Sequence, residues 1–504
     1  MTTAVSKRIL AAILASAMMI PLAACGESGK DTPASTTAAQ DQGEITETAE
    51  ETEPDKFAGV DLGGVEIRIQ TSIDDDDSTN ANFLIEGTGA ENGDVVNDSV
   101  YKRNVDIEDL LNVKLTFIES DETYSTAQSA VKKIIMSGED AYDIIIQDLL
   151  ALGPLAIEGM FLNVADQPVI DFSQPYWWTE YMADLSLGNG TAMYIMAGDF
   201  FADILCSAHC LYLNKQQLEN LTGDPNEIYA KVLDGTWTAD EFLKYIQMAY
   251  QDLNGDSQVN DGDNFGYICI GMWGSAIPMY ICGDLNFVTR DEDGVPTYTL
   301  QDDPRAAQTL EMLNRVYYDS AVNTKISDIP SLRSTFGAGQ ALFCGYQRVG
   351  DFQNFRDLTF DVGIVPYPKL DLQQENYVTS THDTSEAGVI PVTCTKLDTT
   401  ATVIEALCRE THKTVIPAYY ETALKVKYAR DDITSQMLDI IHDNLRVAFP
   451  IAYNTALGSN LLSNTFQVPL SKHSSDFAST MAKVAPKAQA KLEQMIEAYN
   501  ENVG

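Results

Sequence analysis

Between residues 65 and 147 the sequence alternates between segments with strand periodicity and segments with helical periodicity. The expected strands cover residues 65–69, 113–118 and 142–147, and the expected helices cover residues 96–111 and 125–136. This alternation predicts an open α/β sheet with mainly parallel strands and helices packed on its faces. Ligands of such sheets bind beyond the carboxyl ends of the strands, so Gln147 and Asp148, which end an apolar strand, are predicted to face a crevice.

The first 24 residues have the organisation of an export signal. Lys7 and Arg8 precede an apolar run over residues 9–20, and small residues follow it before Cys25. The run is shorter than the roughly 20 residues that a membrane-spanning helix needs, so a removable signal peptide over residues 1–24 is favoured over a transmembrane anchor.

Residues 25–56 follow the signal, and after Cys25 they are rich in Thr, Ala, Ser, Asp and Glu with almost no large apolar side chain. Such a segment cannot bury enough surface to offset the entropy of ordering, which predicts a disordered acidic tether. The fold is expected to begin near Phe57.

Length and charge limit the classes of function. A chain of 504 residues exceeds what one hydrophobic core usually supports, so two or three domains are expected. The net charge of −42 would repel nucleic acid and anionic lipid headgroups, so a small neutral ligand fits better than either.

Seven cysteines follow Cys25, and their odd number and apolar surroundings favour buried small side chains over a disulfide framework. Cys206, His209 and Cys210 are three possible metal ligands. Because no second cluster stands at zinc spacing in the sequence, a metal site there is not favoured. Trp177 and Trp178 are adjacent, and two such rings are not expected to point into one core.

Residues 252–263 match the pattern of a calcium-binding loop, with Asp252 at position one and an apolar Val259 at position eight. The candidate ligands are Asp252, Asn254, Asp256, Gln258, Asn260 and Asp263. Ser257 replaces the usual glycine at position six, and an aspartate replaces the bidentate glutamate at position twelve, so binding should be weak. The strand expected after the loop makes it an isolated loop similar to those of dockerins. A plain acidic turn is the alternative, and no catalytic cofactor is expected.

Five motifs together carry a family resemblance. They are residues 142–148, 211–215, 235–242, 336–342 and 362–368. In this order and spacing they resemble extracellular solute-binding proteins of family 1, the carbohydrate-type receptors of ABC importers. The resemblance implies a periplasmic-binding-protein type II-like α/β fold, with two lobes, a hinge and an interlobe cleft. The first lobe would hold residues 57–198 and 346–412, and the second residues 199–345 and 413–504.

The resemblance also implies a set of ligand-binding residues, which line the cleft of sugar-binding relatives. These are Gln147 and Asp148 at the end of a first-lobe strand, Trp273 in the second lobe, Tyr346 and Gln347 at the crossover, and Tyr453 near the C-terminus. Packing in the core is the alternative for each of these side chains.

The segment Leu22-Ala23-Ala24-Cys25 resembles the bacterial lipobox, which implies that Cys25 is lipidated and becomes the mature N-terminus. The protein would then be a lipid-anchored, monomeric, non-enzymatic binding component of an ABC importer at the extracytoplasmic face of the cell membrane. Its partners would be permease subunits and a small solute, above all a sugar or oligosaccharide. A secreted carbohydrate-active enzyme and a surface adhesion protein are the alternatives.

Overall fold

The computed structural model describes most of the chain from Asp55 onward. The described residues are 55–72, 82–123, 125–187, 192–256, 259–260, 262–272, 274–355, 357–382, 384–425, 432–454, 456–458 and 461–503. The chain divides into two compact units, Met1–Asp55 and Lys56–Gly504, and the elements below belong to the second unit. The expected signal peptide, Cys25 and nearly all of the expected tether lie outside the described residues.

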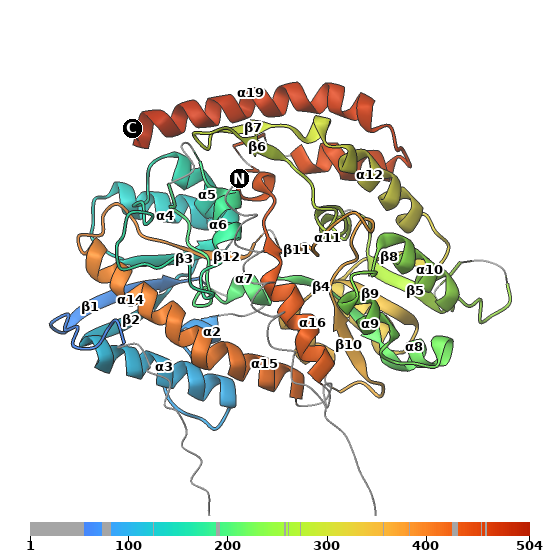
Figure 1. The fold of residues 1–504 in the computed structure, drawn as a ribbon, viewed down its shortest axis with the longest axis horizontal. Helices are drawn as coiled ribbons and strands as arrows, with labels where there is room; N and C mark the ends of the chain where they lie inside the picture. Colours follow the sequence, from blue (N-terminus) through green and yellow to red (C-terminus); the bar gives the residue numbers. More distant parts are fainter. Residues whose placement is uncertain are drawn as a thin grey trace, which may run out of the picture. The chain divides into compact units, whose positions relative to one another are not determined.

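The first of two main sheets has the strand order β12-β3-β1-β2 (Figure 1). Its strands are β1 (Val65–Thr71), β2 (Val113–Glu119), β3 (Ile144–Asp148) and β12 (Glu386–Val389). β1 pairs parallel to both β2 and β3, whereas β12 pairs antiparallel to β3. The three strands expected from the periodicity are therefore confirmed, and a fourth joins them from far along the chain.

The second main sheet has the order β10-β4-β9-β5-β8. Its strands are β4 (His209–Asn214), β5 (Phe265–Ile270), β8 (Val322–Ile326), β9 (Ala341–Arg348) and β10 (Val362–Val365). β5 pairs parallel to β8 and β9, and β4 pairs antiparallel to β9 and β10. Two small sheets complete the set, β6 (Val288–Arg290) with β7 (Pro296–Tyr298) and β11 (Thr379–Ser380) with β13 (Leu445–Arg446).

Helices cover both main sheets (Figure 1). The first sheet carries α2 (Asn82–Ile85), α3 (Val95–Leu111), α4 (Ala127–Met136), α5 (Leu149–Ile157), α14 (Leu397–Glu410) and α15 (Ile416–Lys425). The second carries α8 (Lys215–Thr222), α9 (Glu227–Leu233), α10 (Ala239–Ala249), α12 (Pro304–Tyr317), α13 (Ile329–Gly337) and α16 (Asp432–Asp443). The others are α6 (Thr179–Leu185), α7 (Asp203–Cys206), α11 (Ala276–Ile281), α17 (Phe449–Ala452), α18 (Val468–Ser471) and α19 (Phe477–Val503). Two 3-10 helices, η1 (Leu300–Asp302) and η2 (Val349–Phe355), and two π-helical segments, η3 (Thr411–Val415) and η4 (Ser463–Gln467), complete the described elements.

The structure divides the chain between the two sheets differently from the expected lobe ranges. β10 falls within residues 346–412, which were expected in the first lobe, yet it pairs with β4 of the second sheet. α15 falls within residues 413–504, which were expected in the second lobe, yet it packs against α3 of the first. Both differences have the same reason, because strand pairing and helix packing join residues that are far apart in the sequence.

Local signals explain where several helices begin. Asp303 accepts a hydrogen bond from the Arg305 amide at 2.9 Å and caps α12, whose first residue is Pro304, as the sequence predicts. Thr238 caps α10 in the same way through the Glu241 amide. Gly266 of β5 lets α10 approach closely, because a Cβ atom there would lie 2.0 Å from the Ile246 carbonyl oxygen.

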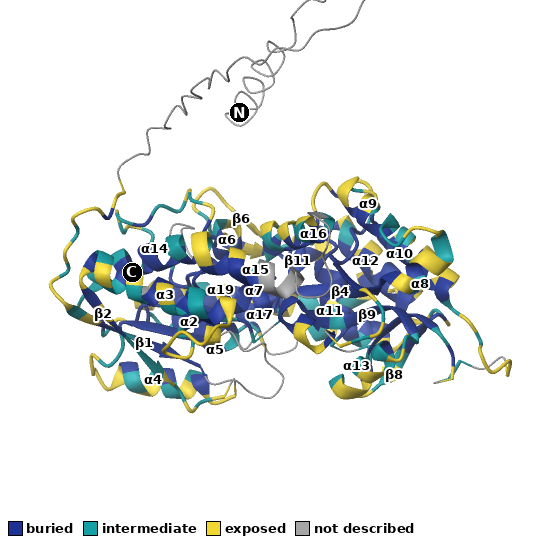
Figure 2. Ribbon diagram, turned by 90° about the horizontal axis from the view of Figure 1, so that it is seen from below, coloured by how far each residue is buried: buried dark blue, intermediate teal, exposed yellow. Residues whose placement is uncertain are grey.

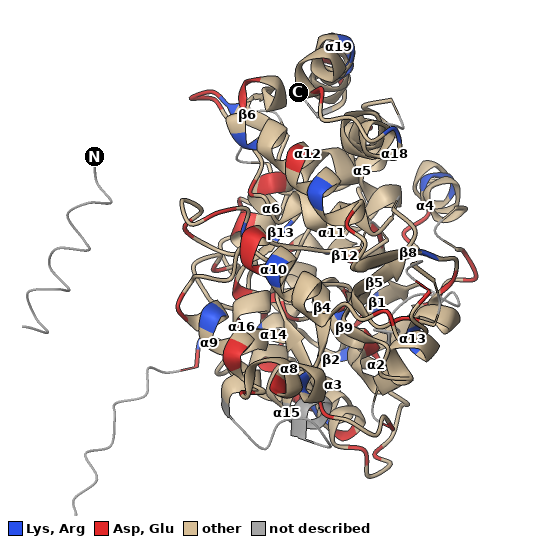
Figure 3. Cartoon of the chain, turned by 90° about the vertical axis from the view of Figure 1, so that its right-hand side faces the viewer, with Lys and Arg blue, Asp and Glu red and all other residues tan. Residues whose placement is uncertain are grey.

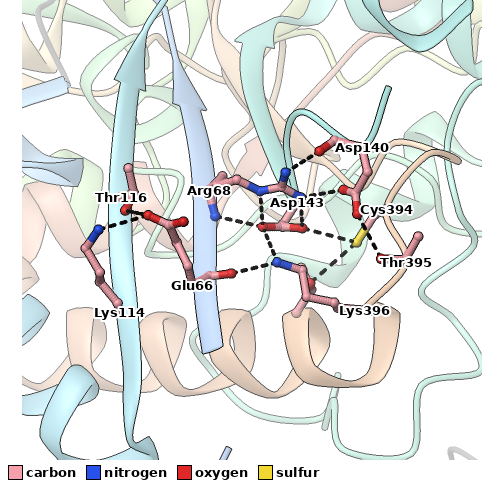
Figure 4. Close-up of polar contacts among 10 residues, drawn as sticks. Glu66, Arg68, Lys114, Thr116, Asp140, Asp143, Cys394, Thr395 and Lys396 are labelled. Carbon is pink, nitrogen blue, oxygen red and sulfur yellow. Dashed lines mark hydrogen bonds and ion pairs between the residues drawn. The ribbon is translucent and has the colours of Figure 1, made fainter. Parts of the chain in front are cut away.

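An ion network centred on the buried Asp143 joins β1, the residue before β3 and the residue before α14 (Figure 4). The Asp143 carboxylate, just before β3, accepts hydrogen bonds from the Arg68 guanidinium on β1 and from Lys396 Nζ at 2.9 Å. Burial opposes the charged carboxylate, but these bonds lower the pKa of Asp143 below its ordinary value. The network lies at the amino end of β3, opposite the end that carries Gln147 and Asp148.

Trp177 and Trp178 are both buried in the core, with 3% and 8% exposure, so the expectation that they cannot share it is wrong. Each indole N–H has its own buried acceptor. Trp177 Nε1 donates to Glu405 at 2.7 Å, and Trp178 Nε1 donates to Asp199 at 3.0 Å. Burial of both rings is possible because neither polar group is left unsatisfied.

The strands of both sheets are largely buried, and exposed residues concentrate on the outer helices and loops (Figure 2). Acidic residues are distributed over many of these outer elements (Figure 3). All seven described cysteines are buried and free, as their apolar surroundings predict. None of the helices in the described part of the chain is long and apolar enough to cross a membrane.

Candidate functional site

A cavity of about 300 Å³ lies where segments of the first and second sheets meet. Its lining comes from seven parts of the chain and consists of Leu150, His209, Gly274, Ile277, Tyr280, Tyr346, His382, Ile451, Asn454, Leu462, Ser463 and Gln467. Leu150 follows the carboxyl end of β3, Gly274 follows β5, and Tyr346 lies near the end of β9. The cavity is therefore at the edge where α/β sheets bind ligands. Its volume is at the small end of the range for small-molecule sites.

A larger cavity of about 440 Å³ does not have this position. It is lined by residues within 457–488 only, and thus by the C-terminal helical segments rather than by both sheets. We therefore regard the 300 Å³ cavity, here called the interlobe cavity, as the candidate site.

Two segments that cross between the sheets bring His209 and His382 into the interlobe cavity. Residues 199–208 lead from the first sheet to β4, and residues 366–385 lead from β10 back to β12. The segments are bonded to each other, since the His382 amide donates to the Ser207 carbonyl at 2.9 Å. As a result the two imidazole rings have centroids 5.9 Å apart.

Both imidazoles are held by neighbouring polar groups. His209 Nδ1 lies 3.0 Å from Ser380 Oγ, and burial is the main reason why the pKa of His209 lies well below its ordinary value. His209 is therefore uncharged near neutral pH. His382 Nδ1 accepts a hydrogen bond from the Thr384 amide at 3.3 Å, which places the proton of the neutral ring on Nε2.

Tyr346 is the most strained residue of the interlobe cavity. Its φ of 55° lies in the left-handed region, which residues with bulky side chains rarely adopt. The conformation is held by a hydrogen bond from its amide to Tyr367 Oη at 3.2 Å. The ring lies against Gly274, where a Cβ atom would be 3.0 Å from Tyr346 Cε2. Strained residues of this kind cluster at ligand sites, so the ring of Tyr346 is the best candidate for a ligand contact.

The rest of the lining combines apolar surface with amide and hydroxyl groups. The Tyr280 ring stacks on Phe466 with centroids 4.6 Å apart and an interplanar angle of 15°, which fixes one wall. Asn454, Ser463 and Gln467 supply groups that can both donate and accept hydrogen bonds. Among the described residues of the lining, none is Asp, Glu, Lys or Arg. The cavity thus offers neutral hydrogen-bonding groups beside aromatic and aliphatic surface.

Gln147 and Asp148 lie at the carboxyl end of β3, as predicted, but they do not line the interlobe cavity. Both side chains are buried, and Gln147 Oε1 accepts a hydrogen bond from the Asp148 amide at 3.1 Å. Gln147 Nε2 is buried without a hydrogen-bond partner. Leu150, two residues after Asp148, is the part of this segment that reaches the lining.

Of the other predicted ligand-binding residues, Tyr346 lines the interlobe cavity, and Trp273 lies outside the described residues. Gln347 is fully buried outside the lining, where its Oε1 accepts a hydrogen bond from Arg333 at 3.4 Å. Tyr453 is also buried outside the lining and donates to the Leu185 carbonyl at 2.6 Å. Its neighbour Asn454 is the residue that reaches the cavity.

Sequence reasoning missed most of the lining, including His209, His382 and Gln467. The sequence indicates His209 only as a possible metal ligand beside Cys206 and Cys210. The sequence comes close to two other lining residues, because Gly274 follows the predicted Trp273 and Asn454 follows the predicted Tyr453. Adjacent residues of a short helix or turn point in different directions, and the sequence alone does not show which of them faces the cavity.

A buried carboxylate joins helices from both lobes at the first crossing segment. Asp199 is 0% exposed and accepts from His412 Nδ1 at 2.6 Å and from His442 Nε2 at 3.3 Å. His412 belongs to η3, next to α15 of the first lobe, and His442 belongs to α16 of the second. Burial alone would lower the pKa of His442, but its hydrogen bonds to Asp199 and Asp443 raise it to about 9.

The structure shows five of the six predicted metal ligands, and Gln258 lies outside the described residues. They occupy the loop between α10 and β5. Within the described residues, no three His, Cys, Asp or Glu side chains converge as a metal site. Asn254, Asp256 and Asn260 nevertheless hydrogen-bond to one another. Asp263 is buried and accepts a hydrogen bond from the Asn260 amide.

No family model matches the sequence, and no curated protein matches it either. The fold does match solved structures. A cyclo/maltodextrin-binding protein in complex with maltotetraose has a TM-score of 0.51 at 10% identity, covering 87% of this chain and 97% of its own. The maltose/maltodextrin-binding domain MalE of Bdellovibrio bacteriovorus, bound to maltotriose, has a TM-score of 0.50 at 13% identity and coverages of 86% and 100%.

An ABC transporter solute-binding protein of Thermotoga lettingae, bound to α-D-tagatose, gives the same TM-score of 0.50 at 13% identity, with coverages of 85% and 100%. At such low identity the likeness shows the fold alone. The expected fold class is confirmed, because this chain has the two-lobed α/β fold of periplasmic-binding-protein type II structures.

Proposed function

We propose that this protein captures a small neutral carbohydrate in the interlobe cavity as the binding component of an ABC importer. The observation that carries the proposal is the chemistry of the lining. On a chain with a net charge of −42, the described residues of this cavity include no acidic or basic side chain except imidazole. Amides, hydroxyls and aromatic rings suit a ligand with many hydroxyl groups and apolar C–H faces.

The fold supports the same proposal. Two lobes joined by crossing segments can close around a ligand, and the three structural relatives named above hold sugars at low sequence identity. Glycoside hydrolases need paired carboxylates at the reacting bond, and the described lining supplies none. We therefore favour capture of a sugar over its hydrolysis.

Calorimetric titration of the purified protein with neutral mono- and oligosaccharides tests the proposal, after a thermal-shift screen has identified a binder. Tyr346→Ala should weaken binding by about fifty- to a hundredfold. Stacking of a sugar on this ring would bury ~100 Å² of apolar surface at ~25 cal/mol per Å², or roughly 2.5 kcal/mol.

Tyr318→Ala is the matched control, because Tyr318 is an exposed tyrosine that stacks on His473 outside the interlobe cavity. This variant should bind the sugar like the wild type. If both tyrosine variants bind with wild-type affinity, the ligand does not lie on Tyr346. If only charged solutes bind, the proposed ligand class is wrong.

We also propose that Cys25 carries a lipid that holds the protein at the extracytoplasmic face of the cell membrane. The support is the likeness of Leu22-Ala23-Ala24-Cys25 to a lipobox after an apolar run. A diacyl group supplies two chains, which is enough for stable anchoring. Cys25→Ser should release the protein into the medium, and retention of the variant in the membrane fraction would show that another segment anchors it. Co-purification with permease subunits would test the importer itself.

A further inference from the structure

The loop that connects α10 to β5 is closed at its base by backbone hydrogen bonds. The Gln251 amide donates to the Asn264 carbonyl at 3.0 Å, and the Asn264 amide donates to the Gln251 carbonyl at 2.9 Å. Gly255, with a φ of 70°, provides a left-handed turn within the loop. The two ends of the loop are thus held together where α10 leads into the buried strand β5.

Three side chains of the loop converge on one another. Asn254 Nδ2 lies 3.0 Å from Asp256 Oδ2 and 3.2 Å from Asn260 Oδ1, and Asn260 Nδ2 lies 3.0 Å from Asp256 Oδ2. Both amide groups donate hydrogen bonds to the Asp256 carboxylate. They thus occupy positions from which a cation could also contact this carboxylate. In the structure Asn254 Oδ1 accepts from the Asp256 amide at 2.9 Å, and Asn260 Oδ1 accepts from the Gly262 amide at 3.0 Å. Rotation of each amide by 180° would turn its oxygen toward the cluster, so a bound ion would have to replace these two backbone hydrogen bonds.

The buried carboxylate of Asp263 gives independent evidence for a bound cation. Its side chain is 0% exposed, and Oδ2 accepts hydrogen bonds from the Asn260 amide at 3.0 Å and from Tyr250 Oη at 3.3 Å. Oδ1 is buried and has no hydrogen-bond partner. A buried carboxylate oxygen without a donor or a cation is unfavourable, and the bond from the Asn260 amide places this carboxyl group directly beside the cluster.

We propose that this loop binds a calcium ion through the side-chain oxygens of Asn254, Asp256, Asn260 and Asp263. Asp252, whose Oδ1 accepts from the Gly255 amide at 2.7 Å, lies at the start of the same loop. All of these donors are oxygens, and a mixture of carboxylates and amides suits calcium, which accepts flexible coordination by six to eight oxygens. Magnesium demands a tighter octahedral geometry and retains several waters, so it fits this loop less well.

The amide content predicts a weak site. Affinity in such loops depends on the number of charged ligands and on rigidity, and here two of the four direct ligands are neutral amides. A bound ion would fix the entry into β5, the strand that precedes the lining residue Gly274. The expected consequence is greater thermal stability of the second lobe, independent of any sugar.

Calorimetry of the purified protein, first treated with chelator and then titrated with calcium alone, tests the site. We expect one saturable binding event and a rise in melting temperature. Terbium gives a second readout, because Tyr250 lies close enough to Asp263 to sensitise its emission. Asp256→Asn and Asp263→Asn should each lower calcium affinity at least tenfold. Asp256 is exposed, so its variant keeps the test valid if the Asp263 variant does not fold.

Asp291→Asn is the matched control, because it changes a carboxylate that caps the turn between β6 and β7 through the Asp293 and Val295 amides. Its calcium response should equal that of the wild type. The proposal is overturned if the wild-type protein shows no saturable calcium binding, or if magnesium gives the same melting shift at the same concentration. It is also overturned if the response persists in both the Asp256 and Asp263 variants. No sugar is present, so these outcomes do not depend on the function proposed above.

Discussion

The contact between His442 and Asp199 should make the stability of this protein depend on pH in a defined direction. Burial opposes the imidazolium, but Asp199 and Asp443 raise the pKa of His442 from an ordinary 6.5 to about 9. When the pKa of a group is higher in the folded than in the unfolded protein, protonation of the group stabilises the folded state. This stabilisation has its full size at pH values below the pKa in the unfolded protein. The contribution should therefore be complete below about pH 6.5 and should be lost as the pH rises through about 9.

The size of the effect follows from the rise in pKa, which corresponds to about 3 kcal/mol of unfolding free energy. His442→Gln removes the titrating group. The difference in unfolding free energy between wild type and variant should be largest near pH 6 and should shrink by about 3 kcal/mol by pH 10. Urea denaturation at a series of pH values measures this difference, in which the titration of groups common to both proteins cancels.

A direct titration separates the pKa from the stability. The chain contains five histidines, so histidine-labelled protein gives few NMR signals, and His442→Gln assigns one of them. Asp443→Asn should lower the midpoint only slightly, because the Asp443 side chain is 73% exposed and its charge is screened. A His442 midpoint near 6.5, together with a stability difference that is constant from pH 6 to 10, would refute the reasoning.

Three further predictions concern buried residues of the described core. Gly388→Ala should destabilise the protein by about 1–3 kcal/mol in urea denaturation, because the new Cβ atom would lie 2.0 Å from Phe201 Cε1. Arg103→Met should cost about 2–4 kcal/mol in the same assay, because the buried guanidinium donates to two carbonyl groups at the end of α2. The buried thiols, exemplified by Cys206, whose pKa burial raises to about 12, should react with a thiol reagent only after denaturation, and fast labelling of the native protein would contradict this.

The sequence alone determined the local elements and, through the order of its motifs, the fold class. The alternation of apolar side chains at residues 65–69 and the apolar run before Gln147 gave β1 and β3. The capping signals at Thr238 and Asp303 gave the starts of α10 and α12. These signals are readable because helix capping and strand periodicity depend on residues only a few positions apart.

Tertiary structure decided which side chains reach the interlobe cavity. Tyr453 and Asn454 are adjacent, yet the first donates to the Leu185 carbonyl inside the core and the second lines the cavity. His209 and His382 meet there although 172 intervening residues separate them in the chain. Such positions depend on how crossing segments pack between two sheets, and that packing balances contacts among residues from the whole chain. No local pattern of the sequence contains this information.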